Sequence, residues 1–288
     1  MTDLHAALAG WAPEPEETAE VVGPWPAAAF SAVLDLPAPA AGEGDPLPLL
    51  WHWFSFLGTP RQSGLGEDGH PAAGRFLPPV PDRRRMIAGG RVRVRAPILV
   101  GERVTRRAEL AAVRVTDGRS GPMAFVTTRY TFRRGDRSGD DVLLTEEQDV
   151  VYRSQPAGQQ RVLPVGEPDA EPEHDWRIET ATGPELLFRF SALTHNAHRI
   201  HYDQPYVTGV EGYPGLVVHG PLLALLLLEV PRRHAGRPVS AFDYRLTSPV
   251  FAGATVLTHG RRSGDDELVL SSMVRGGRTS ITGTARLS

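Results

Sequence analysis

The sequence has 288 residues, enough for one large or two ordinary domains, and its formal net charge of −3 provides no field for nucleic acid or a membrane surface. It contains no cysteine, which excludes disulfides and thiolate chemistry, and all 31 basic residues are arginines, which excludes a lysine Schiff base. The N-terminus lacks a basic segment followed by an apolar core, and the longest apolar run, Leu222–Leu228, is too short to span a bilayer. We therefore expect a cytoplasmic protein that binds neither nucleic acid nor a membrane.

The first part of the chain predicts helices and then strands. Residues 1–46 are rich in Ala, Pro and Glu and are expected to form an N-terminal helical extension. Leu47–Leu57 is apolar on nearly every side, which predicts a buried helix with Pro48 in its first turn. A long Gly- and Pro-rich loop follows over Gly58–Pro81. Alternating sequences rich in Val and Thr then predict strands at Gly90–Ala96, Glu102–Val115, Met123–Arg133 and Val142–Tyr152.

Residues 155–174 are rich in Pro, Gly, Gln and acidic side chains, and we interpret them as a linker. The pattern restarts after this linker, with two helices followed by four strands. The helices are expected at Pro184–Thr194 and Pro221–Val230, and the strands at Ser240–Thr247, Ala254–Arg261, Glu267–Val274 and Thr279–Leu287.

The two halves of the chain repeat one another. The segment Arg93–Val104 resembles Arg245–Val256, with Arg, Pro, Gly and Val in the same register. Pro and Gly on either side of a short apolar step are typical of a bend between two strands, because Pro cannot donate to a ladder and Gly permits the turn. The sequence therefore predicts an α+β protein in which each half is one apolar helix wrapped by an antiparallel sheet.

Three histidines at intervals of three residues mark the richest candidate site, namely His195, His198 and His201. On a helix they would partly share one face, so a metal site has to be considered. No carboxylate or fourth ligand stands at a typical spacing, and we expect no metal. General acid–base chemistry near neutral pH is the other function that histidine suits.

This segment, Thr194–Asp203, resembles the active-site stretch of MaoC-like (R)-specific enoyl-CoA hydratases, and Gly215–Leu222 resembles the start of the central helix in that family. A subgroup with an N-terminal dehydratase-like hotdog domain is more similar still. It includes mesaconyl-C4-CoA hydratases and mitochondrial-type 3-hydroxyacyl-thioester dehydratases. That similarity also lies in Leu49–Phe54, Gln62–Pro71 and Phe76–Pro79.

The resemblance implies a double hotdog fold and a hydro-lyase. Its N-terminal hotdog, residues 47–154, would be non-catalytic, and its C-terminal hotdog, residues 175–288, would carry the active site. The enzyme would add water to an enoyl thioester or remove it from a 3-hydroxyacyl thioester. No cofactor is implied, since CoA or phosphopantetheine, the latter on a carrier protein, belongs to the substrate. The fold is compatible with a monomer of two hotdogs or with a homodimer.

The resemblance also assigns roles to residues. His201 falls at the catalytic histidine and Asn196 at the catalytic aspartate, while the backbone N–H at Gly220 would stabilise the thioester oxygen. An amide does not titrate, so three readings are open. His201 acts alone while Asn196 orients water, or Asp203 or His198 supplies a second group, or the site is inactive.

Four further residues are candidates for substrate binding: His198, His219, Arg245 and Tyr202. For each there is a plainer structural role, such as helix entry for His219, a solvated strand position for Arg245 and a loop anchor for Tyr202. The loop Gln62–Pro79 is equally a cover for the acyl pocket or a surface insertion.

Two other functions and the identity of the acyl group are also open. A hotdog thioesterase would need a carboxylate at the helix, where Glu229 is available, and a non-catalytic acyl-thioester-binding subunit would fit an amide at position 196. A branched dicarboxylic acyl group would require a cation, for which the candidates are Arg61, Arg75, Arg83 to Arg85, Arg199 and Arg245.

Overall fold

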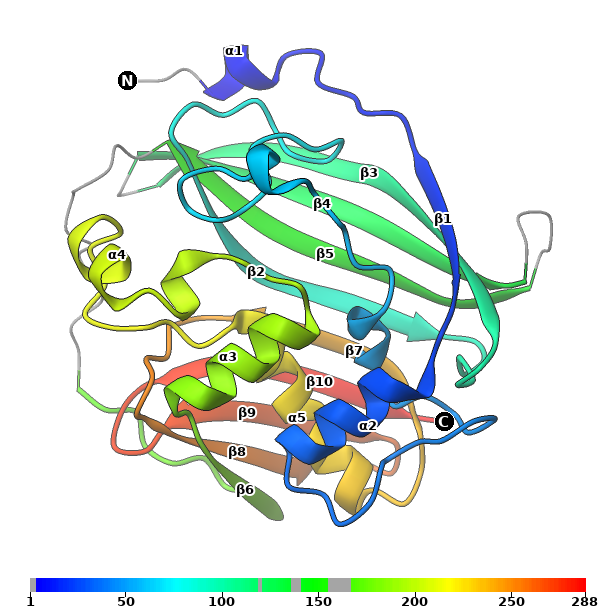
Figure 1. Cartoon of the computed structure of the whole chain (residues 1–288). Helices are drawn as coiled ribbons and strands as arrows, with labels where there is room; N and C mark the ends of the chain where they lie inside the picture. Colours follow the sequence, from blue (N-terminus) through cyan, green and yellow to red (C-terminus); the bar gives the residue numbers. More distant parts are fainter. Residues whose placement is uncertain (1–3, 119–120, 136–140, 155–166) are drawn as a thin grey trace.

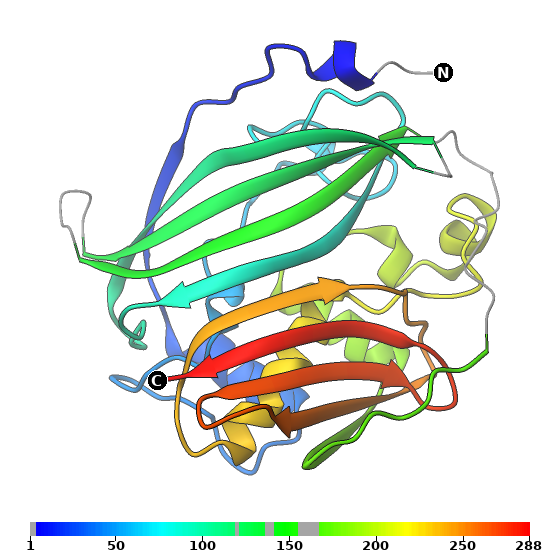
Figure 2. The ribbon, with the colours of Figure 1, turned by 180° about the vertical axis from the view of Figure 1, so that it is seen from behind.

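The computed structural model describes residues 4–118, 121–135, 141–154 and 167–288. Within them, ten strands form one antiparallel sheet in the order β1-β3-β4-β5-β2-β7-β10-β9-β8-β6 (Figures 1 and 2). The strands of the N-terminal half are β1 (Glu16–Val21), β2 (Arg83–Val94), β3 (Arg103–Gly118), β4 (Gly121–Arg134) and β5 (Val142–Ser154). Those of the C-terminal half are β6 (Trp176–Ala181), β7 (Val239–Leu246), β8 (Thr255–Arg262), β9 (Glu267–Val274) and β10 (Thr279–Leu287).

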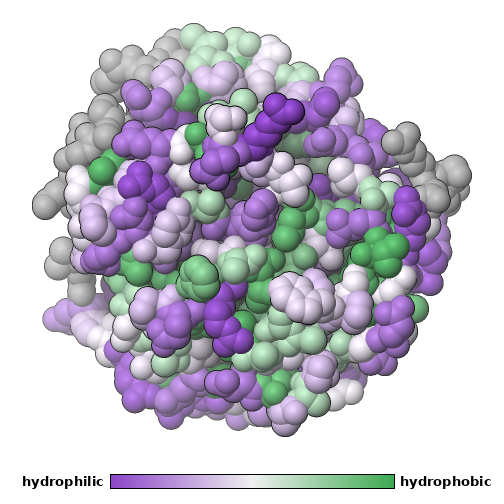
Figure 3. All heavy atoms as spheres, viewed as in Figure 1, coloured by the Kyte–Doolittle hydropathy of each residue, from purple (hydrophilic) through white to green (hydrophobic). Residues whose placement is uncertain are grey.

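The helices of the described residues lie on one side of this sheet or at its ends. The α-helices are α1 (Leu4–Leu8), α2 (Pro24–Val33), α3 (Pro184–Leu193), α4 (Gln204–Gly209) and α5 (Gly220–His234), and the 3₁₀ helices are η1 (Trp51–Phe54), η2 (Gln62–Gly64) and η3 (Arg199–His201). Figure 1 shows α2 and α3 side by side in front of α5, and from behind the sheet of the C-terminal half is uncovered by helices (Figure 2). Apolar residues gather over the face that carries α2 and α3 (Figure 3).

The sheet order reads the same from both ends, with the halves meeting where β2 pairs antiparallel with β7. The predicted repeat accounts for this symmetry. In each half a bend joins two corresponding strands, β2 to β3 and β7 to β8, and its glycine has a left-handed φ, 90° at Gly101 and 89° at Gly253. These values suit glycine and strain other residues. The predicted α+β fold with antiparallel sheets is therefore confirmed.

Helix α5 is the centre of the core. Pro221 stands in its first turn, where a missing N–H costs nothing, and every residue from Leu222 to Pro231 is buried. A helix that is apolar on all sides must be covered on all sides. The C-terminal strands cover one side, while Phe190 of α3 and Phe30 of α2 belong to the same core cluster.

The prediction of a buried helix over Leu47–Leu57 is wrong, because only the 3₁₀ helix η1 forms there. Leu50 and Phe56 have left-handed φ angles of 70° and 55°, which end the helical path on both sides. The rings of Trp51 and Phe54 instead pack on Phe30 of α2, with centroids 4.9 and 4.7 Å apart. Among the described residues of this half, no α-helix takes the place that α5 has in the other half, and α2 lies beside α3 instead (Figure 1).

The N-terminal residues also differ from the expected helical extension over 1–46. Strand β1 pairs with β3 at the edge of the sheet, and α2 follows it, just as β6 and α3 begin the other half. Of the predicted linker 155–174, residues 155–166 lie outside the described residues. Among the residues that are described, no helix has both the length and the hydropathy to cross a membrane.

Candidate active site

His201 lies in η3, in the segment between α3 and α4, and its exposed fraction is only 7%. Its Nδ1 lies 2.7 Å from the backbone oxygen of Val217, and since a carbonyl can only accept, Nδ1 carries the proton. Nε2 has no hydrogen-bond partner among the described residues, and it is not one of their fully buried side-chain atoms that lack such a partner. The ring is therefore fixed with a free acceptor nitrogen that solvent reaches.

Burial lowers the pKa of His201 to about 3, and the hydrogen bond to Val217 opposes this shift only in part. A proton on His70 would lower the pKa further, and the positive charge of Arg85 also lowers it. His201 is therefore neutral at physiological pH, so its Nε2 lone pair is available to take a proton.

His201 belongs to a row of four buried histidines. Its ring stacks on His219 with centroids 3.5 Å apart, and it meets the edge of His198 at 5.4 Å. His198 in turn lies against His70 of the N-terminal half at 3.9 Å. Desolvation lowers the pKa of each of the other three as well, to about 4 for His70 and well below the usual value for His198 and His219. The row is therefore uncharged.

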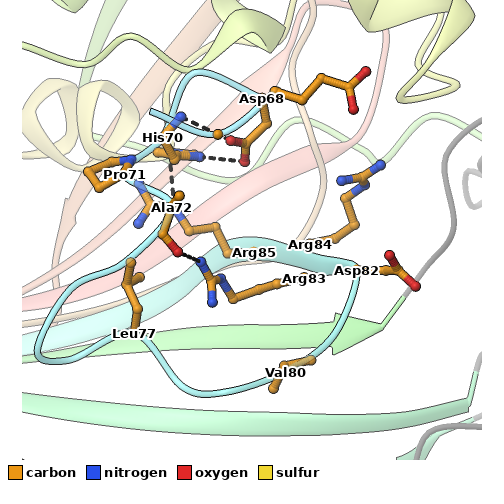
Figure 4. A pocket seen from close by; sticks show the side chains of 12 residues that line it. Asp68, His70, Pro71, Ala72, Leu77, Val80, Asp82, Arg83, Arg84 and Arg85 are labelled. Atoms are coloured by element: carbon orange, nitrogen blue, oxygen red, sulfur yellow. Dashed lines mark hydrogen bonds and ion pairs between the residues drawn. The ribbon is translucent and has the colours of Figure 1, made fainter. Parts of the chain in front are cut away.

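The far end of the row opens on a cavity of about 260 Å³ lined by the N-terminal half (Figure 4). Asp68 lies 3.0 Å from Nδ1 of His70, and Arg85 donates its Nε to Nε2 of the same ring at 2.9 Å. Desolvation works to raise the pKa of Asp68, but the hydrogen bonds from the ring and the backbone N–H of His70, together with the charge of Arg85, outweigh it and hold the pKa at about 2. Asp68 is therefore ionised, and it fixes both the tautomer and the direction of His70.

The loop that carries Asp68 and His70 is pressed against the histidine segment. The backbone N–H of Arg199 donates to the backbone oxygen of Asp68 at 2.8 Å, and Nη1 of Arg199 donates to the backbone oxygen of Glu67 at 3.0 Å. Gly69 has a φ of 85°, and a Cβ there would overlap the carbonyl oxygen of Ala197. The loop thus forms part of the site, which favours the reading of Gln62–Pro79 as a pocket cover over that of a surface insertion.

The start of α5 lies beside the seam between the two halves. His219 is the N-cap residue and Gly220 the first residue of the helix, so the Gly220 N–H has no partner within the helix. A Cβ on Gly220 would overlap Ile87 of β2 and Leu246 of β7. Only glycine allows the seam to approach the helix start this closely, and the N–H groups there favour a developing negative charge.

Asn196 lies at the end of α3 and is partly exposed. Its Oδ1 accepts the backbone N–H of His198 at 3.0 Å, so the amide orientation follows from its partner. The Nδ2 group is left as a donor directed away from that turn. Asn196 thus offers a ligand a hydrogen-bond donor, where an aspartate would offer a second acceptor.

The structure does not bring all predicted binding residues together. Leu246 faces Gly220, and because neighbouring residues of a strand point to opposite faces, Arg245 points away from α5; it is exposed. Tyr202 is 48% exposed and donates to the Ala197 oxygen, as a loop anchor would. His219 is fully buried, with Nε2 2.9 Å from the Ser191 hydroxyl.

Sequence reasoning gave no role to Asp68 and His70, and it left Arg85 as one cation among many. The only available signal was the unusual segment Gln62–Pro71, in which Asp68 and His70 stand within three residues of each other. The reading of Gln62–Pro79 as a pocket cover implied a contact with the histidine segment, but it named no residue that makes the contact.

Asp68, His70 and His198 also have ligand atoms close enough together to hold a metal ion, all within 4.8 Å of one another. Their hydrogen bonding fits a metal poorly. His70 already donates to Asp68, and the guanidinium of Arg85 touches the other ring nitrogen, so a divalent cation would meet a positive charge at once. The set is better explained as a carboxylate–histidine pair that supports Arg85.

The chain is similar to known proteins over most of its length. A family model described as hydroxyacyl-thioester dehydratase type 2 matches residues 50–252. Mesaconyl-C(4)-CoA hydratase of Chloroflexus aurantiacus is 44% identical over 262 residues, which are 91% of this chain and 91% of that protein.

Solved structures of low sequence identity share the fold. The MaoC-like dehydratase from Phytophthora capsici has a TM-score of 0.64 at 14% identity and covers 100% of this chain and 98% of its own. HtdX of Mycobacterium tuberculosis has a TM-score of 0.63 at 17% identity, covering 96% and 100%. These likenesses confirm the predicted hotdog fold.

The neutral histidines predict that the protein loses stability in acid. Unfolded histidine has a pKa near 6.5, whereas the folded pKa is about 4 for His70 and about 3 for His201, so the unfolded chain binds more protons below pH 6.5. Their stabilisation is complete above pH 6.5 and is lost as the pH falls towards 4 and then 3. We expect each such histidine to contribute up to about 1.4 kcal/mol per pH unit to this decline, measured by urea unfolding between pH 7 and 5.

The variant His201→Asn removes one titrating group, so it should make this decline less steep by one proton. Asparagine can still donate to the Val217 oxygen, so the local structure is kept. His195→Asn is the control: it removes an exposed histidine and suits the left-handed φ of 49° at that position. If His201→Asn declines with the same slope as wild type, His201 is not neutral in the folded protein.

Proposed function

The chain belongs to the hydroxyacyl-thioester dehydratase type 2 family, and we propose that it hydrates a branched dicarboxylic enoyl-CoA of the mesaconyl-C4-CoA type. The enzyme is a hydro-lyase acting on acyl thioesters, either adding water to an enoyl thioester or removing it from a 3-hydroxyacyl thioester. The observation that carries the proposed substrate is the 44% identity to mesaconyl-C(4)-CoA hydratase over 91% of both chains. We assign the thioester to CoA on the same basis.

In the mechanism that we propose, His201 is the only group that moves protons. Its free Nε2 takes a proton from water as the water oxygen attacks the β-carbon of the enoyl thioester, giving an enolate-like thioester. The imidazolium then delivers the same proton to the α-carbon, and His201 returns to its neutral form. One base on one face gives addition of H and OH to the same side of the double bond. Burial keeps the imidazole neutral before the reaction, and the lowered pKa makes the imidazolium that forms a strong acid for the second step.

Asn196 would position the water. Its Oδ1 is engaged by the backbone of His198, so the free Nδ2–H group donates to the water oxygen and turns a water proton towards His201. Such positioning raises the rate without a second titrating group.

The start of α5 would stabilise the thioester oxygen. Negative charge builds up on this oxygen during the attack, and the Gly220 N–H at the positive end of the helix is free to bind it. Since a Cβ at Gly220 would overlap Ile87, this N–H lies where a side chain is not tolerated.

The structure gives no support to the thioesterase alternative. Glu229, the carboxylate available for that chemistry, is buried near the end of α5 and paired with Arg232 at 2.5 Å and Arg233 at 3.1 Å. A carboxylate held by two arginines, nine residues after Gly220, is a poor nucleophile or base for a substrate at the helix start.

The substrate proposal predicts a clear order of activities. We expect loss of enoyl absorbance to be fastest with mesaconyl-C4-CoA, with kcat/KM at least about 100-fold above that for crotonyl-CoA, whose β-carbon carries a methyl group and no carboxylate. The test is a side-by-side assay of the two thioesters. Turnover of crotonyl-CoA without hydration of mesaconyl-C4-CoA would reject the proposed substrate class and leave the hydro-lyase assignment intact.

The base assignment is tested with His201→Asn, which keeps the hydrogen bond to Val217 but has no Nε2. We expect kcat to fall by about 1,000-fold or more, with KM little changed, because the base acts in the chemical step. The matched control is His195→Asn in the same segment, which should retain full activity. Equal activity of His201→Asn and wild type would rule out His201 as the base.

The role of Asn196 is tested with Asn196→Asp, which keeps the oxygen that accepts the His198 N–H and replaces the donor by a charge. We expect kcat to fall by about 10- to 100-fold, as an anion in this position no longer donates to water and adds a second titrating group to the pH profile of kcat. A rise in kcat would instead show that the amide limits the reaction.

A further inference from the structure

Arg85 stands out among the arginines that line the cavity. It lies on β2, in the N-terminal half, and its Nε donates to Nε2 of His70 (Figure 4). His70 is a neutral acceptor whose other nitrogen is held by Asp68, so this contact orients the guanidinium without neutralising it.

The two neighbouring arginines are engaged by the protein. Arg83 donates to the backbone oxygens of Pro78 and Ala72, both at 3.1 Å, and Arg84 pairs with the buried Glu211 at 3.3 Å. For Arg85 the described residues provide no ion pair with a carboxylate. Arg85 is nonetheless shielded from solvent, since burial lowers the pKa of Arg85 and raises that of the adjacent Tyr152.

A partly desolvated cation without a counter-ion is costly, and an anionic ligand would remove that cost. Nε donates to His70 and the guanidinium is also hydrogen-bonded to Tyr152, so the remaining N–H groups of Arg85 can meet an anion. A guanidinium matches a carboxylate with two parallel hydrogen bonds, which gives both affinity and orientation.

The position of Arg85 relative to the proposed base indicates which anion Arg85 would bind. His198 touches His70 on one side and the edge of His201 on the other, so Arg85 is separated from the base by two ring contacts. No hydrogen bond to a ring nitrogen of His198 is found in the described part of the chain. The charge of Arg85 lowers the pKa of His70, His198 and His201 alike, as expected for a cation close to all three.

We propose that Arg85, with His198 beside it, is the subsite for a carboxylate carried on the β-carbon of the substrate, and that it determines specificity for dicarboxylic thioesters. This inference rests on the proposed function. In mesaconyl-C4-CoA the free carboxylate is bonded to the carbon that water attacks, so its subsite has to adjoin the base. The pair satisfies this, with His198 next to His201 and Arg85 on the cavity side. It is a binding role, and the proton transfer stays with His201.

The experiment compares mesaconyl-C4-CoA with crotonyl-CoA in the variant Arg85→Gln. We expect kcat/KM for mesaconyl-C4-CoA to fall by about 100-fold or more. The affinity for crotonyl-CoA, measured as KM or as a competitive inhibition constant, should change less than about threefold. Equal losses on both thioesters would overturn the subsite, because they share the CoA moiety and differ at the β-carbon, and would indicate a contact with CoA phosphate.

Arg83→Gln is the matched control, since it removes the same charge from the same cavity but from a guanidinium engaged by backbone oxygens. It should affect both thioesters to the same extent. A loss of selectivity as large as that of Arg85→Gln would overturn the assignment to Arg85, and would indicate that the positive charge of the cavity as a whole determines the selectivity.

Arg85→Lys decides the matter if Arg85→Gln does not fold. Lysine keeps the charge without the fork, so we expect about a tenfold loss confined to mesaconyl-C4-CoA, and equal losses would again overturn the subsite. Failure of the wild-type protein to hydrate mesaconyl-C4-CoA is a separate result, which rejects the proposed substrate class before any variant is considered.

Discussion

The antiparallel pairing of β2 with β7 is the constraint on which the rest of the structure depends. It joins two five-stranded sheets into one, and it requires glycine, since a Cβ on Gly89 would overlap the backbone oxygen of Tyr244 and one on Gly90 would lie 2.8 Å from the Tyr244 hydroxyl. The same close approach brings Ile87 and Leu246 against Gly220 at the start of α5. The first residues of β2 then place Arg85 in the cavity. The pairing of β2 with β7 thus determines where the start of α5 and the cavity lie relative to the boundary between the two halves.

This arrangement gives the N-terminal half more than a supporting role. Its sheet carries no equivalent of the histidine segment, yet its loop supplies Asp68 and His70, and its strand supplies Arg85. The loop holds its position through the hydrogen bonds to Arg199 and the close contact of Gly69 with Ala197. Each half therefore contributes what the other lacks. The C-terminal half has the proposed base, His201, and the helix start, and the N-terminal half has the charged groups Asp68 and Arg85.

Much of the fold could be predicted from the sequence, because strands and repeats leave local patterns. The bounds expected for β9 and β10 are those observed, and the repeated bend before Gly101 and Gly253 anticipated the symmetric sheet. The prediction of a helix over Leu47–Leu57 was wrong because a segment that is apolar on every side has no periodicity that distinguishes a helix from a packed turn. There, aromatic packing on Phe30 outweighed helix propensity.

The site was predictable only where its residues are neighbours in the chain. His198, His201 and Asn196 share one segment, and Gly220 was indicated by the helix start. Whether Arg245 faces α5 could not be read from the sequence, because the face of a strand depends on register and a shift of one residue reverses it. The contact of His70 with His198 spans more than a hundred residues and is created by the docking of the loop, so no local pattern could reveal it.

In the mechanism that we propose, the residues around His201 also give a reason why an amide at position 196 would be compatible with activity. Close to the base, the charge of Arg85 lowers the pKa of His201, and Arg85 is held by the neutral His70 ring, whose other nitrogen Asp68 fixes. A carboxylate at position 196 would add an anion beside the place where we propose that a substrate carboxylate binds, and two anions at such a distance repel strongly in a desolvated site. An asparagine donates to water without adding charge. We infer that Asn196 and Arg85 serve the same end. The substrate brings its own negative charge, Arg85 receives it, and the amide keeps a second one away, so that His201 alone moves the proton.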